Sequence, residues 1–195
     1  MLQGLWRKGS GAATGPIRQK FASVVRPTGV ERTFHPDDVI VSKTDTKGII
    51  TYANDIFLEL AGITEAQAIG APHSVIRHPD MPRAVFKLLW DTLLEGNEIF
   101  AYVLNMSVTG DHYWVFAHVT PTFTVDGGIT GFHSNRRVPE KAALEVVKPL
   151  YASLKAIEDQ ASDRASGLQA SFTAVLELLR DKGMSYDEFV FSLTR

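Results

Sequence analysis

The chain has 195 residues, of which 45% are hydrophobic and 22% are charged, as in ordinary globular proteins. Its 22 acidic and 20 basic residues give a net charge of −2, so no overall attraction to nucleic acid or to an anionic membrane is expected. The sequence contains no cysteine, which excludes disulfides, thiolate metal sites, catalytic thiols and cysteinyl adducts.

Residues 1–34 are expected to form an N-terminal extension that is flexible or partly helical, because Gly, Ser and Ala cluster between Gly9 and Pro16. The start of the chain lacks the charged-then-apolar order of a secretory signal. No run of about 18 apolar residues, enough to span a membrane, occurs in the sequence. We therefore expect a cytoplasmic protein without membrane insertion.

A β-hairpin is predicted where two β-prone runs, 39–44 and 49–53, flank the turn sequence Asp45-Thr46-Lys47-Gly48. Two short helices should follow it. The N-cap of the first is expected at Asn54 or Asp55, and its end at Gly62.

The second short helix should open with a capping box formed by Thr64 and Gln67 and stop at Gly70. Polar residues therefore mark the start of both helices, and glycines mark their ends.

The segment from Pro72 to Pro82 is a stiff polar loop with two histidines, an arginine, an aspartate and three prolines. Asp80 stands where the N-cap of a helix over 81–94 belongs. The free N–H groups of that helix, together with Arg77 and His78, would suit a phosphate or another anion. The alternative is structural: Asp80 is an ordinary cap, Arg77 is a surface or ion-paired residue, and the prolines stiffen the loop.

The helix over 81–94 is predicted to bury one face, because apolar residues recur there at helical spacing, namely Phe86, Leu89, Trp90 and Leu93. Trp90 is expected to pack in the core rather than to contact a ligand. Three strands should follow, at 99–106, 112–120 and 129–136, as an antiparallel meander. Neither face of the middle strand is plainly polar, so both faces of the sheet should be covered.

Residues 139–195 are helical in pattern and are expected to form a C-terminal extension for dimerisation or partner docking. Pro149 should kink or break its first helix. A second helix should end near Gly183, and a capping box at Ser185 and Glu188 should open a third. The apolar stripes of these helices either cover the sheet or form an interface with a second copy or a partner.

Three motifs resemble a known family: Asp45-x-x-Gly48-x-Ile50-x-x-Ala53-Asn54-Asp55, His73-x-x-x-Arg77-His78-Pro79-Asp80-Met81-Pro82 and Gly110-Asp111-His112-Tyr113-Trp114-Val115. With the order of the predicted elements, they resemble the FAD-binding PAS sensor domains of bacterial aerotaxis receptors (Aer) over residues 38–154. The resemblance implies an α+β PAS fold over 35–138, a five-stranded antiparallel sheet with short helices on one face.

The resemblance also implies a function in signal transduction. PAS domains of this kind hold FAD non-covalently and report redox or oxygen state to a signalling partner in chemotaxis, motility or related regulation. Residues carried over by motif would line or shape the flavin site: Asn54, His73, Arg77, His78 and Asp80. Asn105 lies where flavin-binding PAS domains often place an amide, which can both donate to and accept from the isoalloxazine edge.

Around Asn105 the family has basic residues and a tryptophan, whereas this chain has Leu104, Met106 and Val108, with Ile99 at the position of the tryptophan. Two alternatives to a flavin sensor therefore stay open. One is a cofactor-free module for protein interaction and dimerisation, in which His73, Arg77 and His78 only fix the loop.

The other alternative is a haem-binding gas sensor, since a neutral imidazole suits an axial position. It is the less favoured one, because His78 precedes a proline and His112 and His118 are expected to face outward. An enzyme is not indicated, since no nucleophile elbow, P-loop, dinucleotide fingerprint or HExxH spacing occurs. We expect a homodimer that signals to a separate protein and has no metal site.

Overall fold

The computed structural model describes residues 25–194, so most of the extension expected at 1–34 lies outside the described residues. The elements follow in the order β1 (Ile40–Asp45), β2 (Ile50–Ala53), α2 (Asp55–Ala61), α3 (Glu65–Ala68), the 3₁₀ helix η1 (His73–Ile76), α4 (Arg83–Leu94), β3 (Ile99–Met106), β4 (His112–Phe123), β5 (Ile129–Arg137), α5 (Lys141–Gln160), α6 (Arg164–Lys182) and α7 (Tyr186–Ser192).

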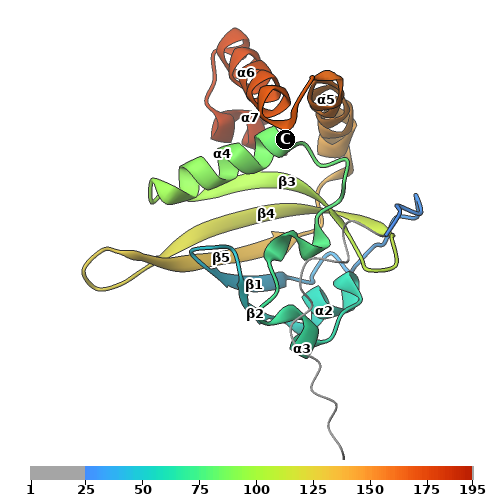
Figure 1. Ribbon diagram of the computed structural model, residues 1–195, viewed down its shortest axis with the longest axis vertical. Helices are drawn as coiled ribbons and strands as arrows, with labels where there is room; N and C mark the ends of the chain where they lie inside the picture. Colours follow the sequence, from blue (N-terminus) through green and yellow to red (C-terminus); the bar gives the residue numbers. More distant parts are fainter. Residues whose placement is uncertain (1–24, 195) are drawn as a thin grey trace, which may run out of the picture.

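The five strands form one antiparallel sheet in the order β2-β1-β5-β4-β3. The hairpin β1–β2 therefore joins the meander β3–β4–β5 through the pairing of β1 with β5 (Figure 1). The predicted α+β fold, with its five-stranded antiparallel sheet and short helices, is confirmed. β4 alone extends clearly past its predicted end at 120, to Phe123.

The two short helices begin at the predicted caps and the first ends at the predicted glycine, whereas α3 ends at Ala68, two residues before Gly70. The Asn54 side chain accepts a hydrogen bond from the Phe57 N–H at the start of α2, and Gly62 ends that helix in the left-handed conformation with φ 71°. At α3, Thr64 and Gln67 form the capping box. These boundaries could be predicted because each depends on residues only a few positions apart.

The predicted N-cap at Asp80 is wrong, because α4 begins at Arg83 and Pro82 occupies the N-cap position. The Asp80 side chain is 72% exposed. The acceptor at this helix end is instead Glu158 of α5, whose Oε1 lies 3.0 Å from the N–H nitrogen of Ala84. A carboxylate 74 residues away in the sequence fills the place that the local pattern assigned to Asp80.

The two faces of the sheet at β3 and β4 are covered by different helices, as predicted. On the outer face, the Tyr151 hydroxyl of α5 donates to the Tyr102 carbonyl at 2.8 Å, and the rings of Phe100 and Phe191 of α7 lie 4.8 Å apart. The inner face carries Val103 and faces α4. Figure 1 shows α5, α6 and α7 gathered beside α4 at the β3 end of the sheet, and α2 and α3 at the β2 end.

Pro149 was expected to kink or break the first C-terminal helix, and it does not break it, since α5 continues from Lys141 to Gln160. Pro149 and Glu145, whose carbonyl loses its helical donor, are both exposed, so water can replace the missing hydrogen bond. The buried face of α5 packs in the core and holds the helix together.

The apolar stripe of α6 is used within the chain, where Val175 and Leu179 are buried in the common core. α6 ends at Gly183 and the capping box of Ser185 and Glu188 opens α7, both as predicted.

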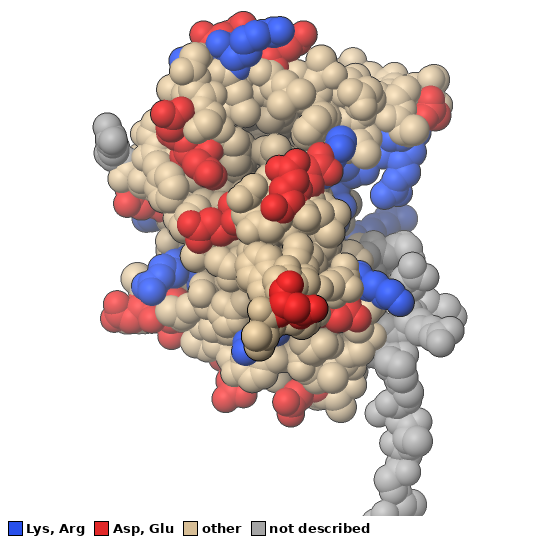
Figure 2. All heavy atoms as spheres, turned by 90° about the vertical axis from the view of Figure 1, so that its left-hand side faces the viewer, with Lys and Arg blue, Asp and Glu red and all other residues tan. Residues whose placement is uncertain are grey.

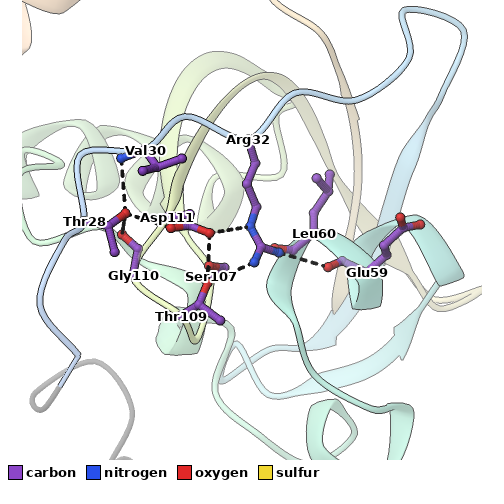
Figure 3. A network of polar contacts seen from close by, with 9 residues as sticks. All are labelled: Thr28, Val30, Arg32, Glu59, Leu60, Ser107, Thr109, Gly110 and Asp111. Atoms are coloured by element: carbon purple, nitrogen blue, oxygen red, sulfur yellow. Dashed lines mark hydrogen bonds and ion pairs between the residues drawn. The ribbon is translucent and has the colours of Figure 1, made fainter.

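The segment from Val25 to Phe34 runs along the β3–β4 turn (Figure 3). Asp111 in this turn accepts hydrogen bonds from Thr28 Oγ1 at 2.7 Å and from Arg32 Nε at 3.1 Å. Arg32 also donates to the carbonyl of Leu60 at the end of α2, at 3.1 Å. The hydrogen bonds to Asp111 lower the pKa of its carboxyl group.

Gly110 is required in the same turn for two reasons. Its φ of +93° lies in the region that favours glycine, and a Cβ there would lie 2.3 Å from the Arg26 carbonyl oxygen. The Gly110-Asp111 motif therefore joins the segment before β1 to the sheet and to α2.

Charge is mixed on the surface drawn in Figure 2, where acidic and basic side chains are interspersed among uncharged ones. Within residues 25–194, no helix combines the length and the apolar character needed to cross a bilayer.

Candidate functional site

A cavity of about 280 Å³, called cavity A below, lies between the inner face of the sheet, α4 and the loop that contains η1. It is lined by Ser42, Thr44, Lys47, Gly48, Pro72, His73, Ser74, Arg77, Phe86, Leu89, Trp90, Leu93, Val103, Asn105, Ala117, Val119, Phe132, Ser134 and Arg136.

One side of cavity A is apolar. The four residues of the predicted α4 stripe face the cavity opposite aliphatic residues of β3 and β4. The Trp90 ring meets Phe132 of β5 edge to face, with centroids 5.2 Å apart at 80°. Trp90 is thus partly buried, packs against the core and also forms part of the cavity wall. A wall of this kind suits a flat apolar ring system.

The opposite end of cavity A holds a buried arginine. Arg136 of β5 is 4% exposed, and its Nη2 donates to Ser42 Oγ at 2.9 Å and to His73 Nε2 at 2.7 Å. Its guanidinium carbon lies 5.7 Å from the centroid of the Phe57 ring. No carboxylate of the described chain lies within 4.0 Å of this guanidinium.

Burial and charge fix the protonation states at this end of the cavity. Burial lowers the pKa of Arg136 to about 10, so the group stays protonated at neutral pH. Burial and the neighbouring Arg136 charge lower the pKa of His73 to about 3. His73 is therefore neutral, and its Nε2 accepts the hydrogen bond from Arg136.

Three buried polar atoms of cavity A have no hydrogen-bond partner among the described residues: Asn105 Nδ2, Ser134 Oγ and Arg136 Nη1. A buried polar group without a partner costs roughly 1–3 kcal/mol. Two of the three atoms are obligate donors, so the cavity presents N–H groups that lack acceptors. A ligand with carbonyl or heterocyclic nitrogen acceptors would complement them.

The loop from Pro72 to Pro82 forms one wall of the cavity and is held in place on both sides. The His73 N–H donates to the Gly48 carbonyl at 2.9 Å, and the backbones of Arg77 and Asn105 form an isolated bridge. Met81 is 1% exposed and anchors the far end of the loop.

The Arg77 side chain lies over the Phe86 ring of α4, with its guanidinium carbon 4.1 Å from the ring centroid. Its Nη2 donates to the Met81 carbonyl at 3.3 Å. Burial lowers the pKa of Arg77 to about 10, so this side chain also stays charged at neutral pH.

The structure brings together three of the six residues expected at a flavin site: His73, Arg77 and Asn105 line cavity A. Asn54 does not line it, because its amide caps α2 and also bonds Val41 N–H at 2.9 Å and the Val39 carbonyl at 2.8 Å.

His78 and Asp80 also lie outside the lining of cavity A. His78 is 4% exposed, and its Nδ1 accepts the Asp80 N–H at 3.1 Å, so it fixes the loop. Burial lowers the pKa of His78.

Sequence analysis missed Ser42, Ser134 and Arg136. The last two share a face of β5 with the buried Phe132, at alternate positions 132, 134 and 136. An arginine on the buried face of a strand is uncommon, and that pattern could have singled out Arg136.

A family model described as "PAS fold" matches residues 50–135, which include β2, α4 and the meander that form most of cavity A. The chain contains a PAS domain.

Similar proteins extend this identification. The aerotaxis receptor of Escherichia coli (strain K12) is 40% identical over 120 residues, which are 62% of this chain and 24% of the receptor. The nitrogen fixation regulatory protein of Klebsiella pneumoniae is 27% identical over 99 residues, 51% of this chain and 20% of that protein. The chain therefore aligns with a quarter or less of these relatives.

The fold of the PAS domain also matches solved structures. The light-state structure of the blue-light photoreceptor Aureochrome1 LOV has a TM-score of 0.50 at 22% identity, covering 56% of this chain and 88% of that one. A light-oxygen-voltage domain studied with a flavin analogue also has a TM-score of 0.50, at 18% identity, covering 57% and 84%. At these identities the similarity concerns the fold.

His73→Gln should weaken the dependence of stability on pH. Because the pKa of His73 is about 3 in the folded chain and near 6.5 when unfolded, the unfolded state binds the extra proton as the pH falls below 6.5. Stability is therefore lost on acidification, by about 2 kcal/mol from this group between pH 7 and pH 5.

The measurement is denaturant unfolding of the wild type and of His73→Gln at both pH values, with the exposed His35→Gln as the control. The variant at position 73 should lose about 2 kcal/mol less than the wild type. Equal losses in all three proteins would contradict the assignment of a neutral His73.

Proposed function

We propose that this PAS domain binds FAD non-covalently, with the isoalloxazine ring in cavity A, and reports the redox state of the flavin to a partner protein in the cytoplasm. The main support is the set of three unpartnered polar atoms, from Asn105, Ser134 and Arg136, in a cavity with an aromatic and aliphatic wall. Non-covalent binding agrees with the absence of cysteine from the sequence.

The residues of cavity A suit an isoalloxazine ring. The apolar wall complements the faces of the ring, while Asn105 Nδ2 and Arg136 Nη1 can donate to its carbonyl oxygens or ring nitrogens. A volume of about 280 Å³ is just below the range of roughly 300–1,000 Å³ for small-molecule sites. Cavity A therefore suits the ring system but not a whole dinucleotide.

A bound flavin would supply reversible reduction, during which negative charge on the ring can increase. The positive charge of Arg136 stabilises added negative charge at this end of the cavity. Arg136 also bonds Ser42 of β1 and His73 of η1, so a change in its hydrogen bonding reaches both elements. These contacts offer a route from the flavin to the sheet.

The C-terminal helices are the proposed output of the sensor. We infer that residues 35–138 form the sensory unit and that 139–195 serve dimerisation or partner docking. The hydrogen bond from Tyr151 of α5 to the Tyr102 carbonyl of β3 joins the two parts, and Tyr102 is adjacent to the cavity residue Val103. The relatives named as an aerotaxis receptor and a nitrogen fixation regulatory protein support a regulatory role.

The two alternatives have weaker support. A cofactor-free module would rely on water alone to pair with the three polar atoms of cavity A, which have no partner among the described residues. For a haem sensor, the histidine that lines cavity A would be the axial ligand, yet His73 Nε2 already accepts a hydrogen bond from Arg136.

The absorption spectrum of the freshly purified protein tests the proposal. We expect bands near about 370 and 450 nm, released as free FAD on denaturation. A Soret band would replace the proposal with a haem sensor. A colourless protein that does not quench the fluorescence of added flavin would replace it with the cofactor-free module.

Asn105→Leu should weaken flavin binding without loss of stability, whereas Asn54→Leu should lower stability. Asn105→Leu removes an unpartnered buried amide, so we expect flavin affinity to fall about tenfold while the unfolding free energy of the flavin-free protein stays equal or rises. Asn54→Leu removes an N-cap and two further hydrogen bonds, so it should lower the unfolding free energy by about 1–2 kcal/mol.

Flavin fluorescence titration and urea unfolding measure the two quantities for both variants. If Asn105→Leu keeps wild-type flavin affinity, the assignment of Asn105 to the site is wrong.

A further inference from the structure

A second cavity of about 450 Å³, called cavity B, adjoins cavity A. Ser74 and Arg77 line both, so the two spaces lie on either side of the loop that contains η1. The far wall of cavity B comes from the C-terminal helices, through Lys155 and Glu158 of α5 and Arg164 at the start of α6.

Cavity B has an excess of positive charge. Arg77, Arg83, Lys155 and Arg164 line it against only two carboxylates, Glu158 and Asp159. The charges on the surface in Figure 2 are interspersed, whereas here four cationic side chains, one each from the loop, α4, α5 and α6, converge on one space.

The carboxylates neutralise only part of this charge. Glu158 is committed to the start of α4, because it accepts from Arg83 Nε at 2.8 Å and from the Ala84 N–H at 3.0 Å. Asp159 pairs with Lys155. Among residues 25–194, the Arg164 guanidinium donates no hydrogen bond to a protein acceptor. The Arg77 guanidinium donates one, to the Met81 carbonyl.

We propose that cavity B binds the pyrophosphate of the FAD whose ring occupies cavity A, so that α5 and α6 form part of the cofactor site. The inference rests on the proposed flavin function. It follows from three observations: cavity A suits only the ring, cavity B shares Arg77 with it, and cavity B gathers arginine and lysine donors suited to phosphate oxygens.

This arrangement gives the dinucleotide a structural role. A pyrophosphate between Arg77 and Arg164 would connect the loop that forms one wall of cavity A to the first turn of α6. The junction is tightly packed, since a Cβ at Gly167 would lie 2.7 Å from the Glu158 carbonyl oxygen and 3.2 Å from Arg83 Nη2. Binding of FAD, but not of riboflavin, would therefore hold the C-terminal helices against the PAS domain.

The experiment compares FAD and riboflavin on the full chain freed of flavin, by fluorescence titration. The variant is the double substitution Lys155→Gln and Arg164→Gln. The control is Lys141→Gln with Arg180→Gln, which removes the same charge from exposed positions of the same helices outside cavity B. We expect the cavity B variant to bind FAD at least about tenfold more weakly and riboflavin within about twofold of the wild type.

The control should bind both flavins like the wild type. Equal effects of the cavity B variant on FAD and riboflavin, or no effect on either, would overturn the inference while leaving a flavin sensor standing. If neither flavin binds to the wild type, the proposed function itself fails.

Competition with ADP tests whether cavity B binds the phosphates of FAD or those of a separate nucleotide. If cavity B serves the cofactor, ADP should compete with FAD and leave riboflavin binding unchanged. ADP that binds together with FAD would mark a separate nucleotide site and overturn the inference.

Hydrogen exchange gives a readout that is independent of affinity. FAD, but not riboflavin, should slow exchange around residues 155–167, and equal protection by both flavins would also contradict the inference.

Discussion

The buried charge of Arg136 is the constraint on which this site depends. Placing a guanidinium at 4% exposure without a carboxylate partner is costly, because a charge loses its hydration when it leaves water. Two neutral acceptors, Ser42 and His73, offset part of that cost, and Nη1 remains without a partner among the described residues. Replacing such a buried charge by a well-packed apolar residue is often neutral or stabilising, so the presence of the arginine supports the proposed ligand site.

The rest of the PAS domain positions that charge and encloses the space beside it. The β1–β5 pairing sets Ser42 opposite Ser134, next to Arg136. The loop from Pro72 to Pro82 brings His73 to the same point and is held by the Gly48 carbonyl and by Met81. The start of α4 is in turn fixed by Glu158 of α5, so the wall of the cavity and the C-terminal helices depend on one another.

Local sequence predicted those parts of the fold that local interactions determine. The caps at Asn54, Thr64 and Ser185 and the strand pattern of the meander needed only neighbouring residues and alternation. The start of α4 could not be predicted in this way, because its acceptor comes from Glu158 in another element. Similarly, the helix at Pro149 continues because its buried face is packed, which a local rule about proline does not include.

The difference between local and long-range interactions also explains which residues of the candidate site could be predicted. Motif resemblance led to His73, Arg77 and Asn105, which line cavity A, and also to Asn54 and His78, whose side chains hold the backbone in place. A sequence motif does not distinguish a residue that lines the cavity from one that holds the backbone, because either role requires a particular residue type at a particular position. Arg136 was missed although its place on the buried face of β5 is a local signal, whereas its hydrogen bond to Ser42 arises only when β5 pairs with β1.

A crystal structure of the full chain with FAD tests the central claim most directly. The account predicts electron density for the isoalloxazine ring in cavity A, with acceptor atoms of the ring within hydrogen-bond distance of Arg136 Nη1 and Asn105 Nδ2. Density for the ring elsewhere, or a cavity A filled by protein side chains while FAD is bound, would contradict it.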